Sequence, residues 1–227
     1  MQGQVRKQTR TGYHLFEVGQ IVVDTENDQQ GNSVEMRSLQ TYTYKEIVDR
    51  AYNLGKALTA RKLYFQEPER KMKLVGIYSK NVLEWFITDW ACCLFGYTTV
   101  PLYDTLGKDN LEDCIETTQI TTLFISAKTA LGVVKFNLKG TLKTVISYDR
   151  LPGDVVDKIR DAGLELIYYE DLLAEGGKSK ITNSNVIVKP DDIYSFCYTS
   201  GTTGMAKGAL ISHRNMLAAI SSFILHK

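Results

Sequence analysis

Apolar and polar positions follow two alternating periods along the chain. Short runs rich in β-branched and aromatic residues predict strands, and longer stretches with apolar residues three or four positions apart predict helices. The predicted strands cover residues 21–23, 39–43, 73–78, 98–101, 121–125, 142–147, 164–168, 192–198 and 208–212. The predicted helices cover residues 44–60, 82–95, 108–117, 127–138, 154–161 and 214–226. This alternation predicts an α/β fold, with helices flanking both faces of a mostly parallel sheet.

Two predicted helices carry start signals. Thr43 precedes the helix 44–60 and Glu46 follows three residues later, which is a capping-box pattern. Asn81 is expected to cap the helix 82–95. The large aromatic residues of that second helix are expected to pack in the core rather than to bind a substrate; they are Trp85, Phe86 and Trp90.

The ends of the chain and one internal stretch differ from this pattern. Residues 1–11 are basic and contain no acidic residue, so we expect a flexible, solvated tail. Residues 174–190 contain paired glycines with serine, asparagine and lysine, and are the best candidate for a linker between subdomains. Residues 12–227 are expected to form the folded part.

Composition excludes several classes of protein. The 227 residues are 44% hydrophobic and 23% charged, which suits a globular protein with a sizeable core. With 27 basic against 26 acidic residues, no electrostatic argument favours a nucleic-acid partner. We expect no transmembrane segment, because the most apolar stretch, 85–101, is too short to span a bilayer. A peripheral membrane contact stays open.

The cysteines indicate a reducing environment. They have neither CxxC nor histidine-containing ligand spacing, and each lies among apolar residues: Cys92, Cys93, Cys114 and Cys197. We therefore expect buried free thiols and a cytoplasmic protein. No metal-ligand cluster, acid–base pair or Ser-His-Asp arrangement is expected.

One glycine-rich segment carries candidate chemistry. Residues 198–208 follow a predicted strand and combine hydroxyls, three glycines and one lysine. Glycines let backbone N–H groups approach phosphate oxygens, hydroxyls add donors, and a lysine stabilises charge on a departing pyrophosphate. The residues expected to bind phosphate are Thr199, Ser200, Gly201, Thr202, Thr203, Gly204 and Lys207.

The spacing around the lysine excludes two common phosphate loops. A Walker loop, GxxxxGK[ST], needs glycine before the lysine and serine or threonine after it. Here Ala206 precedes Lys207 and Gly208 follows it, and a GxGxxG dinucleotide turn does not fit either. A flexible linker is a poor explanation, because predicted strands flank both sides of the segment.

The segment resembles the phosphate-binding signature of the AMP-forming adenylate synthetases, and residues 212–215 resemble its continuation. That signature usually has proline where this chain has Ala206, which implies a less rigid loop. Residues 79–81, 84–85 and 100–107 are similar to blocks of long-chain acyl-CoA synthetases. The resemblance runs in order from about residue 12 to the end of the chain.

The resemblance implies a long-chain fatty-acid–CoA ligase. In that family a fatty-acid carboxylate attacks the α-phosphorus of ATP, pyrophosphate leaves, and CoA then displaces AMP. Lys207 takes the catalytic role by electrostatic stabilisation, and the other loop residues hold the β- and γ-phosphates. Mg²⁺ bridges phosphate oxygens, and one loop threonine is a candidate ligand.

The resemblance also implies an incomplete enzyme. Similar proteins continue with an adenine-binding segment, a ribose-binding aspartate, a hinge and a small C-terminal domain, none of which follows residue 227. Residues 12–227 then form a partial N-terminal AMP-binding domain with negligible ligase activity alone. The expected location is the cytoplasm, with contact to an organelle membrane such as the endoplasmic reticulum left open.

Two other functions stay open. The chain is alternatively a truncated, non-catalytic paralogue that binds a nucleotide or a partner, or part of an adenylate-forming ligase for another carboxylic acid.

The roles of two local groups of residues also stay open. Tyr103 and Asp104 face the active cleft, or Asp104 or Thr105 caps the following helix. His213 lies near the substrates or starts the last helix, and we favour the start of the helix.

Overall fold

The computed structural model describes residues 18–23, 36–136, 138, 140–184, 186–199 and 206–225. The chain divides into two compact units, Met1–Val48 and Asp49–Lys227. Each unit is described by itself. The expected basic tail, residues 1–11, lies outside the described residues.

The first unit contains a two-stranded antiparallel sheet. Strands β1 (Val18–Val23) and β2 (Met36–Tyr42) pair with Ile21 opposite Leu39. Helix α1 (Tyr44–Arg61) begins directly after β2. The predicted capping box is confirmed, because Glu46 N donates to Thr43 Oγ1 over 3.2 Å and Thr43 N donates to Glu46 Oε2 over 2.7 Å.

The second unit contains an eight-stranded sheet in the order β10-β9-β5-β4-β6-β7-β8, with β3 paired to β4. Strands β4 to β9 run parallel, and β3 and β10 are antiparallel to their neighbours. The predicted mostly parallel sheet is confirmed. The strands are β3 (Phe65–Gln66), β4 (Lys73–Tyr78), β5 (Thr98–Leu102), β6 (Thr122–Ile125), β7 (Thr144–Ser147), β8 (Glu165–Tyr168), β9 (Ile193–Thr199) and β10 (Lys207–Ser212).

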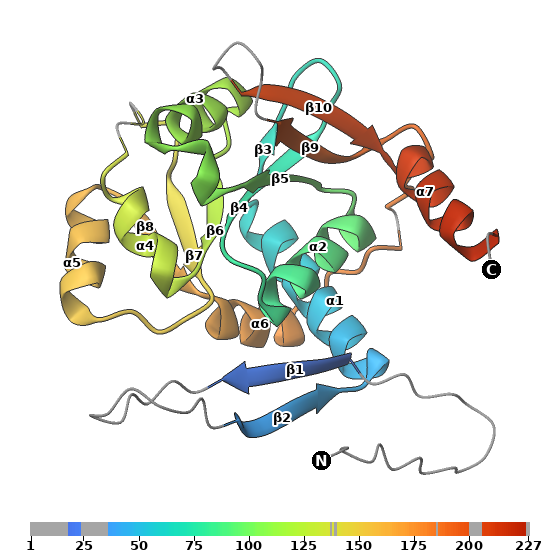
Figure 1. The fold of residues 1–227 in the computed structure, drawn as a ribbon, viewed down its shortest axis with the longest axis horizontal. Coiled ribbons are helices and arrows are strands. Elements are labelled where there is room, and N and C mark those ends of the chain that lie inside the picture. The colour runs from blue at the N-terminus through green and yellow to red at the C-terminus, as the bar shows by residue number, and fades with distance from the viewer. Residues whose placement is uncertain are drawn as a thin grey trace. The chain divides into compact units, whose positions relative to one another are not determined.

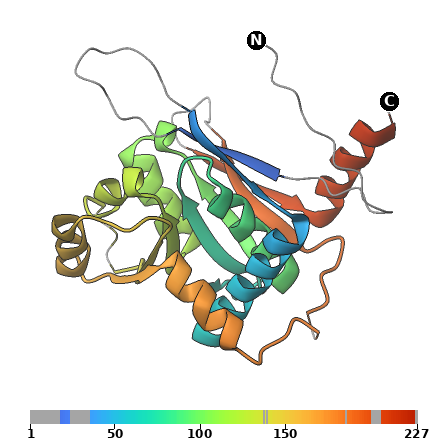
Figure 2. The same ribbon diagram turned by 90° about the horizontal axis from the view of Figure 1, so that it is seen from below.

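Helices lie on both faces of this sheet (Figures 1 and 2). Alternate residues of a strand point to opposite faces. Leu74 and Tyr78 of β4 join a buried cluster with α3, α4 and α5, whereas Val75 and Ile77 are buried on the other face. The helices of the unit besides α1 are α2 (Leu83–Phe95), α3 (Lys108–Thr118), α4 (Ala127–Val133), α5 (Gly153–Asp161), α6 (Tyr169–Lys178) and α7 (His213–Leu225), with the 3-10 turn η1 (Asp104–Leu106) before α3.

Aromatic rings connect the second face of the sheet to its helices. Phe124 of β6 stacks on Tyr148 with ring centroids 5.6 Å apart, and Tyr148 meets Tyr169 of α6 edge to face at 5.4 Å. The Tyr148 hydroxyl donates to Thr88 Oγ1 of α2 over 3.0 Å. Helices α2 and α6 therefore pack on the same face as Phe124.

The expected linker over 174–190 is partly wrong, because α6 extends to Lys178. A Cβ added at Gly176 would lie 1.8 Å from the backbone oxygen of Asn53 in α1. This glycine therefore allows two helices to cross closely. The paired glycines that indicated a linker are used for packing, and the irregular segment begins at Ser179.

Three other local predictions are also corrected. The N-cap of α2 is Val82 without a side-chain cap, so Asn81 does not take that position in the described structure. Helix α4 ends at Val133, earlier than expected. Trp85, Phe86 and Trp90 are half-buried rather than core residues, because α2 buries Leu83, Ile87, Ala91 and Phe95 instead.

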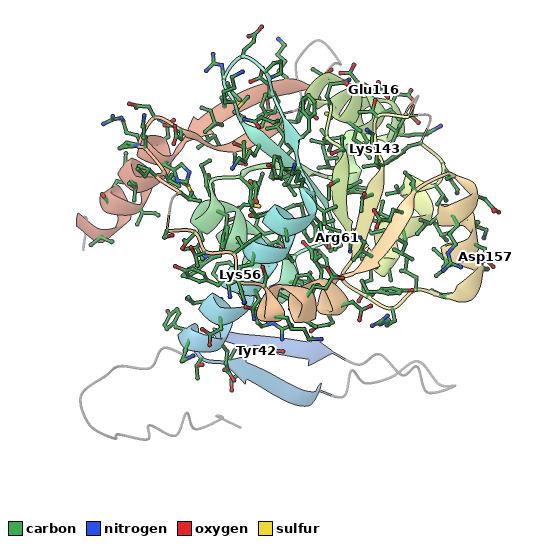
Figure 3. All side chains as sticks on the ribbon, turned by 180° about the vertical axis from the view of Figure 1, so that it is seen from behind. Tyr42, Lys56, Arg61, Glu116, Lys143 and Asp157 are labelled. Atoms are coloured by element: carbon green, nitrogen blue, oxygen red, sulfur yellow. The ribbon has the colours of Figure 1, made fainter. Side chains whose placement is uncertain are left out.

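Ion pairs join the end of α1 to β8 and α6. Arg61, labelled in Figure 3, donates through Nη2 to Glu165 Oε1 over 2.7 Å. Its Nη1 lies 3.5 Å from Glu175 Oε1 of α6. These groups are partly exposed, so the pairs orient the elements more than they stabilise them.

Candidate functional site

The carboxyl ends of the parallel strands meet at one edge of the sheet. β4 ends at Tyr78, β5 at Leu102 and β9 at Thr199. The chain passes from β4 to β5 on one side and then crosses to β6 on the other. Such a reversal of direction opens a crevice at the carboxyl ends, which is the usual ligand position in open α/β sheets.

The glycine-rich segment connects β9 to β10 at this edge. Thr199 and Lys207 are direct partners across the two antiparallel strands, and Thr199 Oγ1 donates to the Lys207 carbonyl over 3.3 Å. The Lys207 side chain is exposed. The hairpin therefore places a charged group where the loop rejoins the sheet.

The other residues predicted to bind phosphate lie outside the described part of the chain: Ser200, Gly201, Thr202, Thr203 and Gly204. Their role stays a prediction. The described structure brings together Thr199 and Lys207 of the predicted set.

Gly208 has a different use from the one expected. As one of the three glycines of residues 198–208, it was expected to let backbone N–H groups approach phosphate oxygens, but it lies within strand β10, opposite Tyr198. A Cβ at this position would lie 2.3 Å from Cε1 of Phe196. Glycine is therefore needed here as space for an aromatic ring.

Asn110 of α3 contacts the end of the loop, and it belongs to no motif that would have singled it out in the sequence. Ala206 N donates to Asn110 Oδ1 over 3.4 Å. Asn110 Nδ2 donates to the Leu106 carbonyl over 2.9 Å. One amide therefore bonds both the glycine-rich loop and the corner that precedes α3.

A cavity of about 410 Å³ opens beside this corner. Tyr103 lines it and is 47% exposed, and burial of part of its ring raises its pKa. The prediction that Tyr103 faces a cleft is consistent with this position. The lining residues come from the ends of β4 and β5, the segment after β4, the turn η1 and helix α4: Tyr78, Ser79, Lys80, Asn81, Leu102, Tyr103, Thr105 and Thr129.

The alternative that Asp104 or Thr105 caps α3 is wrong. The N-cap of α3 is Gly107, with φ at 78°, and it has no side-chain cap in the described structure. A positive φ favours glycine, which explains the residue at this turn. Thr105 is exposed and lines the cavity.

His213 lies away from the loop. His213 is separated from Lys207 by strand β10, which spans about 17 Å from Lys207 to Ser212 at 3.4 Å per residue. It is the first residue of α7, and Asn215 N donates to Ser212 Oγ over 3.2 Å. The preferred prediction that His213 starts the last helix is confirmed. Burial lowers its pKa.

A second cavity, of about 540 Å³, lies at the opposite edge of the sheet. Residues of the β3–β4 turn and of the segment before β9 line it, together with His213. The strands begin at this edge, whereas ligands of open α/β sheets bind where the strands end. We therefore place the candidate site at the smaller cavity and the loop.

The four cysteines, all within the described residues, are free thiols. Cys92 and Cys114 are buried as expected, but Cys93 and Cys197 are half-buried. Burial raises the pKa of the Cys114 thiol to about 12, which makes it a poor nucleophile at neutral pH. Among the described residues, no group of three histidine, cysteine or acidic side chains is placed to bind a metal ion.

Comparison with known proteins identifies the family. The family model of the AMP-binding enzymes matches residues 23–227. The chain belongs to the AMP-binding enzyme family. In this family member the glycine-rich segment lies inside the matched region, as does the corner at residues 100–107.

The relatives of this AMP-binding chain include long-chain-fatty-acid–CoA ligase 1 of Cavia porcellus, which is 29% identical over 95% of the chain and 30% of the relative. Fatty acyl-CoA synthetase B of Dictyostelium discoideum is 34% identical over 66% of the chain and 23% of the relative. The chain thus spans less than a third of the length of these relatives.

Solved structures share the fold. The A-PCP didomain of carboxylic acid reductase from Segniliparus rugosus, in complex with AMP, has a TM-score of 0.68 at 18% identity. The match covers 88% of this chain and 30% of the didomain chain. Fatty acyl CoA synthetase of Mycobacterium tuberculosis has a TM-score of 0.56 at 17% identity, and the match covers 82% of this chain and 32% of the synthetase chain.

In the described ranges, we find no helix with the length and apolarity that crossing a bilayer requires.

Proposed function

We propose that this AMP-binding chain is part of a ligase that activates a long-chain fatty acid with ATP and transfers it to CoA. The observation that carries the proposal is the β9–β10 hairpin, which presents Lys207 beside Thr199 at the carboxyl edge of the sheet. The names of the relatives supply the fatty-acid substrate.

In the proposed first step, a carboxylate oxygen of the fatty acid bonds to the α-phosphorus of ATP. The bond from that phosphorus to the bridging oxygen breaks, and its electrons leave with pyrophosphate. Lys207 Nζ stabilises the charge that develops on the departing group, and loop N–H groups and hydroxyls orient it. In the second step the CoA thiol displaces AMP.

Mg²⁺ is proposed as a companion of ATP, not as a resident metal. Mg²⁺ usually keeps several waters and binds phosphate oxygens with one or two protein ligands. The described part of the chain offers the Thr199 hydroxyl beside the loop and no acidic cluster. We therefore propose that Mg²⁺ is held mainly by the substrate phosphates.

We further propose that the 227-residue polypeptide does not complete the reaction alone. Support comes from its coverage, because about 70% of the Cavia relative has no counterpart in the matched region. The proposed location is the cytoplasm, with peripheral contact to an organelle membrane. Free, half-buried thiols such as Cys197 support a reducing compartment.

Exchange of labelled pyrophosphate into ATP tests the function, measured on the protein that carries this chain. The assay compares palmitate, a coumarate-like acid and a mixture of amino acids. The proposal expects exchange with palmitate that exceeds exchange with the others. Exchange with an aryl or amino acid but none with palmitate would show a ligase for another acid, and nucleotide binding without any exchange would show a non-catalytic paralogue.

A further inference from the structure

The exit of the glycine-rich loop is bonded to a side chain outside the loop. Ala206, the residue before Lys207, carries a backbone N–H that donates to Asn110 Oδ1 over 3.4 Å. Ala206 is half-buried and packs against the cluster formed by the sheet with α3, α4 and α5. One hydrogen bond and one apolar contact therefore restrain the residue that precedes the lysine.

Asn110 is itself held in place. Its Nδ2 donates to the Leu106 carbonyl over 2.9 Å, and Leu106 packs against the same buried cluster. The amide uses its donor on one side and its acceptor on the other, which fixes which way it points. It therefore presents a defined acceptor to the loop.

Strand pairing restrains Lys207 from one side. It is the first residue of β10, an edge strand that pairs only with β9 among the described strands, and its ladder partner there is Thr199. On the loop side it follows Ala206, whose N–H is bonded to Asn110. A charge that must meet a phosphate loses much of its effect when displaced by about 1 Å.

We infer that Asn110 is a positioning residue for Lys207. Its amide holds the loop exit and thereby sets where the lysine side chain starts. The inference rests on the proposed function in one respect, namely that Lys207 meets the phosphates of ATP. The anchoring itself is independent of that function.

A purely helical role for Asn110 predicts the opposite behaviour. Asparagine is a weak helix former, and Asn110 lies in the first turn of α3. Asn110→Ala would then leave α3 as stable or more stable. If Asn110→Ala lowers the exchange protection of the Ala206 amide or the activity, the cause is therefore the loss of the two hydrogen bonds of the Asn110 side chain.

Hydrogen–deuterium exchange of the Ala206 amide tests the anchor directly in the intact chain. Asn110→Ala removes the acceptor, and we expect exchange of this amide to become about fivefold faster, as for the loss of one ordinary hydrogen bond. Asn110→Asp keeps the acceptor and loses the donor, so exchange should stay as slow as in the unaltered protein. Asp109→Ala, at an exposed position in the same turn, is the control. Unchanged exchange of the Ala206 amide in Asn110→Ala overturns the inference.

A double-mutant cycle tests the consequence for activity. Asn110→Ala is expected to lower kcat/KM for ATP about fivefold in pyrophosphate exchange. Ala206→Pro has no N–H to donate, so Asn110→Ala should cost less than about twofold in that background. The same loss in both backgrounds would show that Asn110 acts by another route.

The two measurements separate failure of the inference from failure of the proposed function. A protein that exchanges no pyrophosphate with any acid, but whose Ala206 amide loses protection in Asn110→Ala, refutes the ligase and keeps the anchor. A protein with palmitate exchange and an unaffected amide refutes the anchor and keeps the ligase. If Ala206→Pro does not fold, the amide measurement alone decides.

Discussion

Thr199 and Lys207 face each other as the last residue of β9 and the first residue of β10, and the Thr199 hydroxyl donates to the Lys207 carbonyl over 3.3 Å. Strand pairing thus brings together the two ends of the loop. Because β4, β5 and β9 run parallel, Thr199 and the cavity that Tyr103 lines lie at the same edge of the sheet.

Lys207 is predicted to affect the rate of adenylation and not the stability of the folded protein. In the protein that carries this chain, Lys207→Ala should lower kcat for adenylation by about a hundredfold, because a charge that stabilises the leaving group is lost. Its side chain is exposed, so the free energy of unfolding should change by less than about 0.5 kcal/mol. Rapid-quench measurement of adenylate formation and urea unfolding report the two effects.

The control for this prediction is another exposed lysine. Lys189 precedes β9 at the opposite edge of the sheet, and Lys189→Ala should leave both quantities unchanged. An unaltered kcat in Lys207→Ala would remove the lysine from the proposed mechanism.

Substitution of the two adjacent glycines of α6 by alanine is predicted to have very different effects on the free energy of unfolding. A Cβ at Gly176 would lie 1.8 Å from the Asn53 backbone oxygen, whereas one at Gly177 would have its nearest neighbour, Asn53 Nδ2, at 3.6 Å. Gly176→Ala should therefore lower the free energy of unfolding by about 1–3 kcal/mol or more. Gly177→Ala should be neutral or stabilising, since alanine is the better helix former.

Urea unfolding of the two single variants measures this difference, and Gly177→Ala serves as the matched control. Equal stability of the two variants would show that α1 and α6 do not cross as closely as described.

Gly208 and Phe196 are predicted to be coupled. Gly208→Ala places a methyl group 2.3 Å from Phe196 Cε1 and should destabilise the protein by about 1–3 kcal/mol. Phe196→Leu frees space, so adding it to Gly208→Ala should cost less than Phe196→Leu costs alone. A double-mutant cycle in urea measures the coupling energy. Strictly additive effects would contradict the proposed steric role of Gly208.

Asp89 is predicted to make stability depend on pH. It is 7% exposed and accepts a hydrogen bond from the Tyr194 hydroxyl, and burial raises its pKa above the ordinary 3.8. The folded state then binds the proton more tightly than the unfolded state. The protonated carboxyl favours folding below about pH 3.8, and this contribution is lost as pH rises through the raised pKa.

At neutral pH the buried charge of Asp89 therefore opposes folding. Asp89→Asn should raise the free energy of unfolding at pH 7 on the order of 1 kcal/mol, with an advantage that shrinks towards pH 4. Asp157→Asn, at the exposed position of α5 labelled in Figure 3, is the matched control for the same change at the surface. Thermal or urea unfolding across this pH range measures both, and a constant difference for Asp89→Asn would contradict the assignment.

Periodicity predicted most of the sheet because each strand is short, apolar and β-branched. The run at Lys73–Tyr78 and the apolar helix Leu83–Phe95 were both predictable within about a residue. Helix α6 was not predicted at all, and its last turn was assigned to a linker because Gly176 and Gly177 are typical of loops. Only the helix behind them, with Asn53 in contact, shows why a glycine is required.

Part of the candidate site was also predictable from the sequence, and part was not. The spacing of glycines, hydroxyls and Lys207 excluded the Walker and dinucleotide loops, because those loops need particular neighbours of the lysine. Asn110 carried no such signal. It is 96 residues away from Ala206 along the chain, and only folding of α3 beside β9 makes it a partner.

The sequence by itself determined most of the order of strands and helices, the position of the glycine-rich loop after a strand, and the resemblance of that loop to a phosphate-binding signature. Such features depend on local composition and on spacing, which a chain displays without folding. The tertiary structure alone decided that Gly208 makes room for Phe196, that Gly176 lies against Asn53, and that Asn110 bonds the loop exit. These are contacts between residues on different elements or turns, and no pattern within one element encodes them.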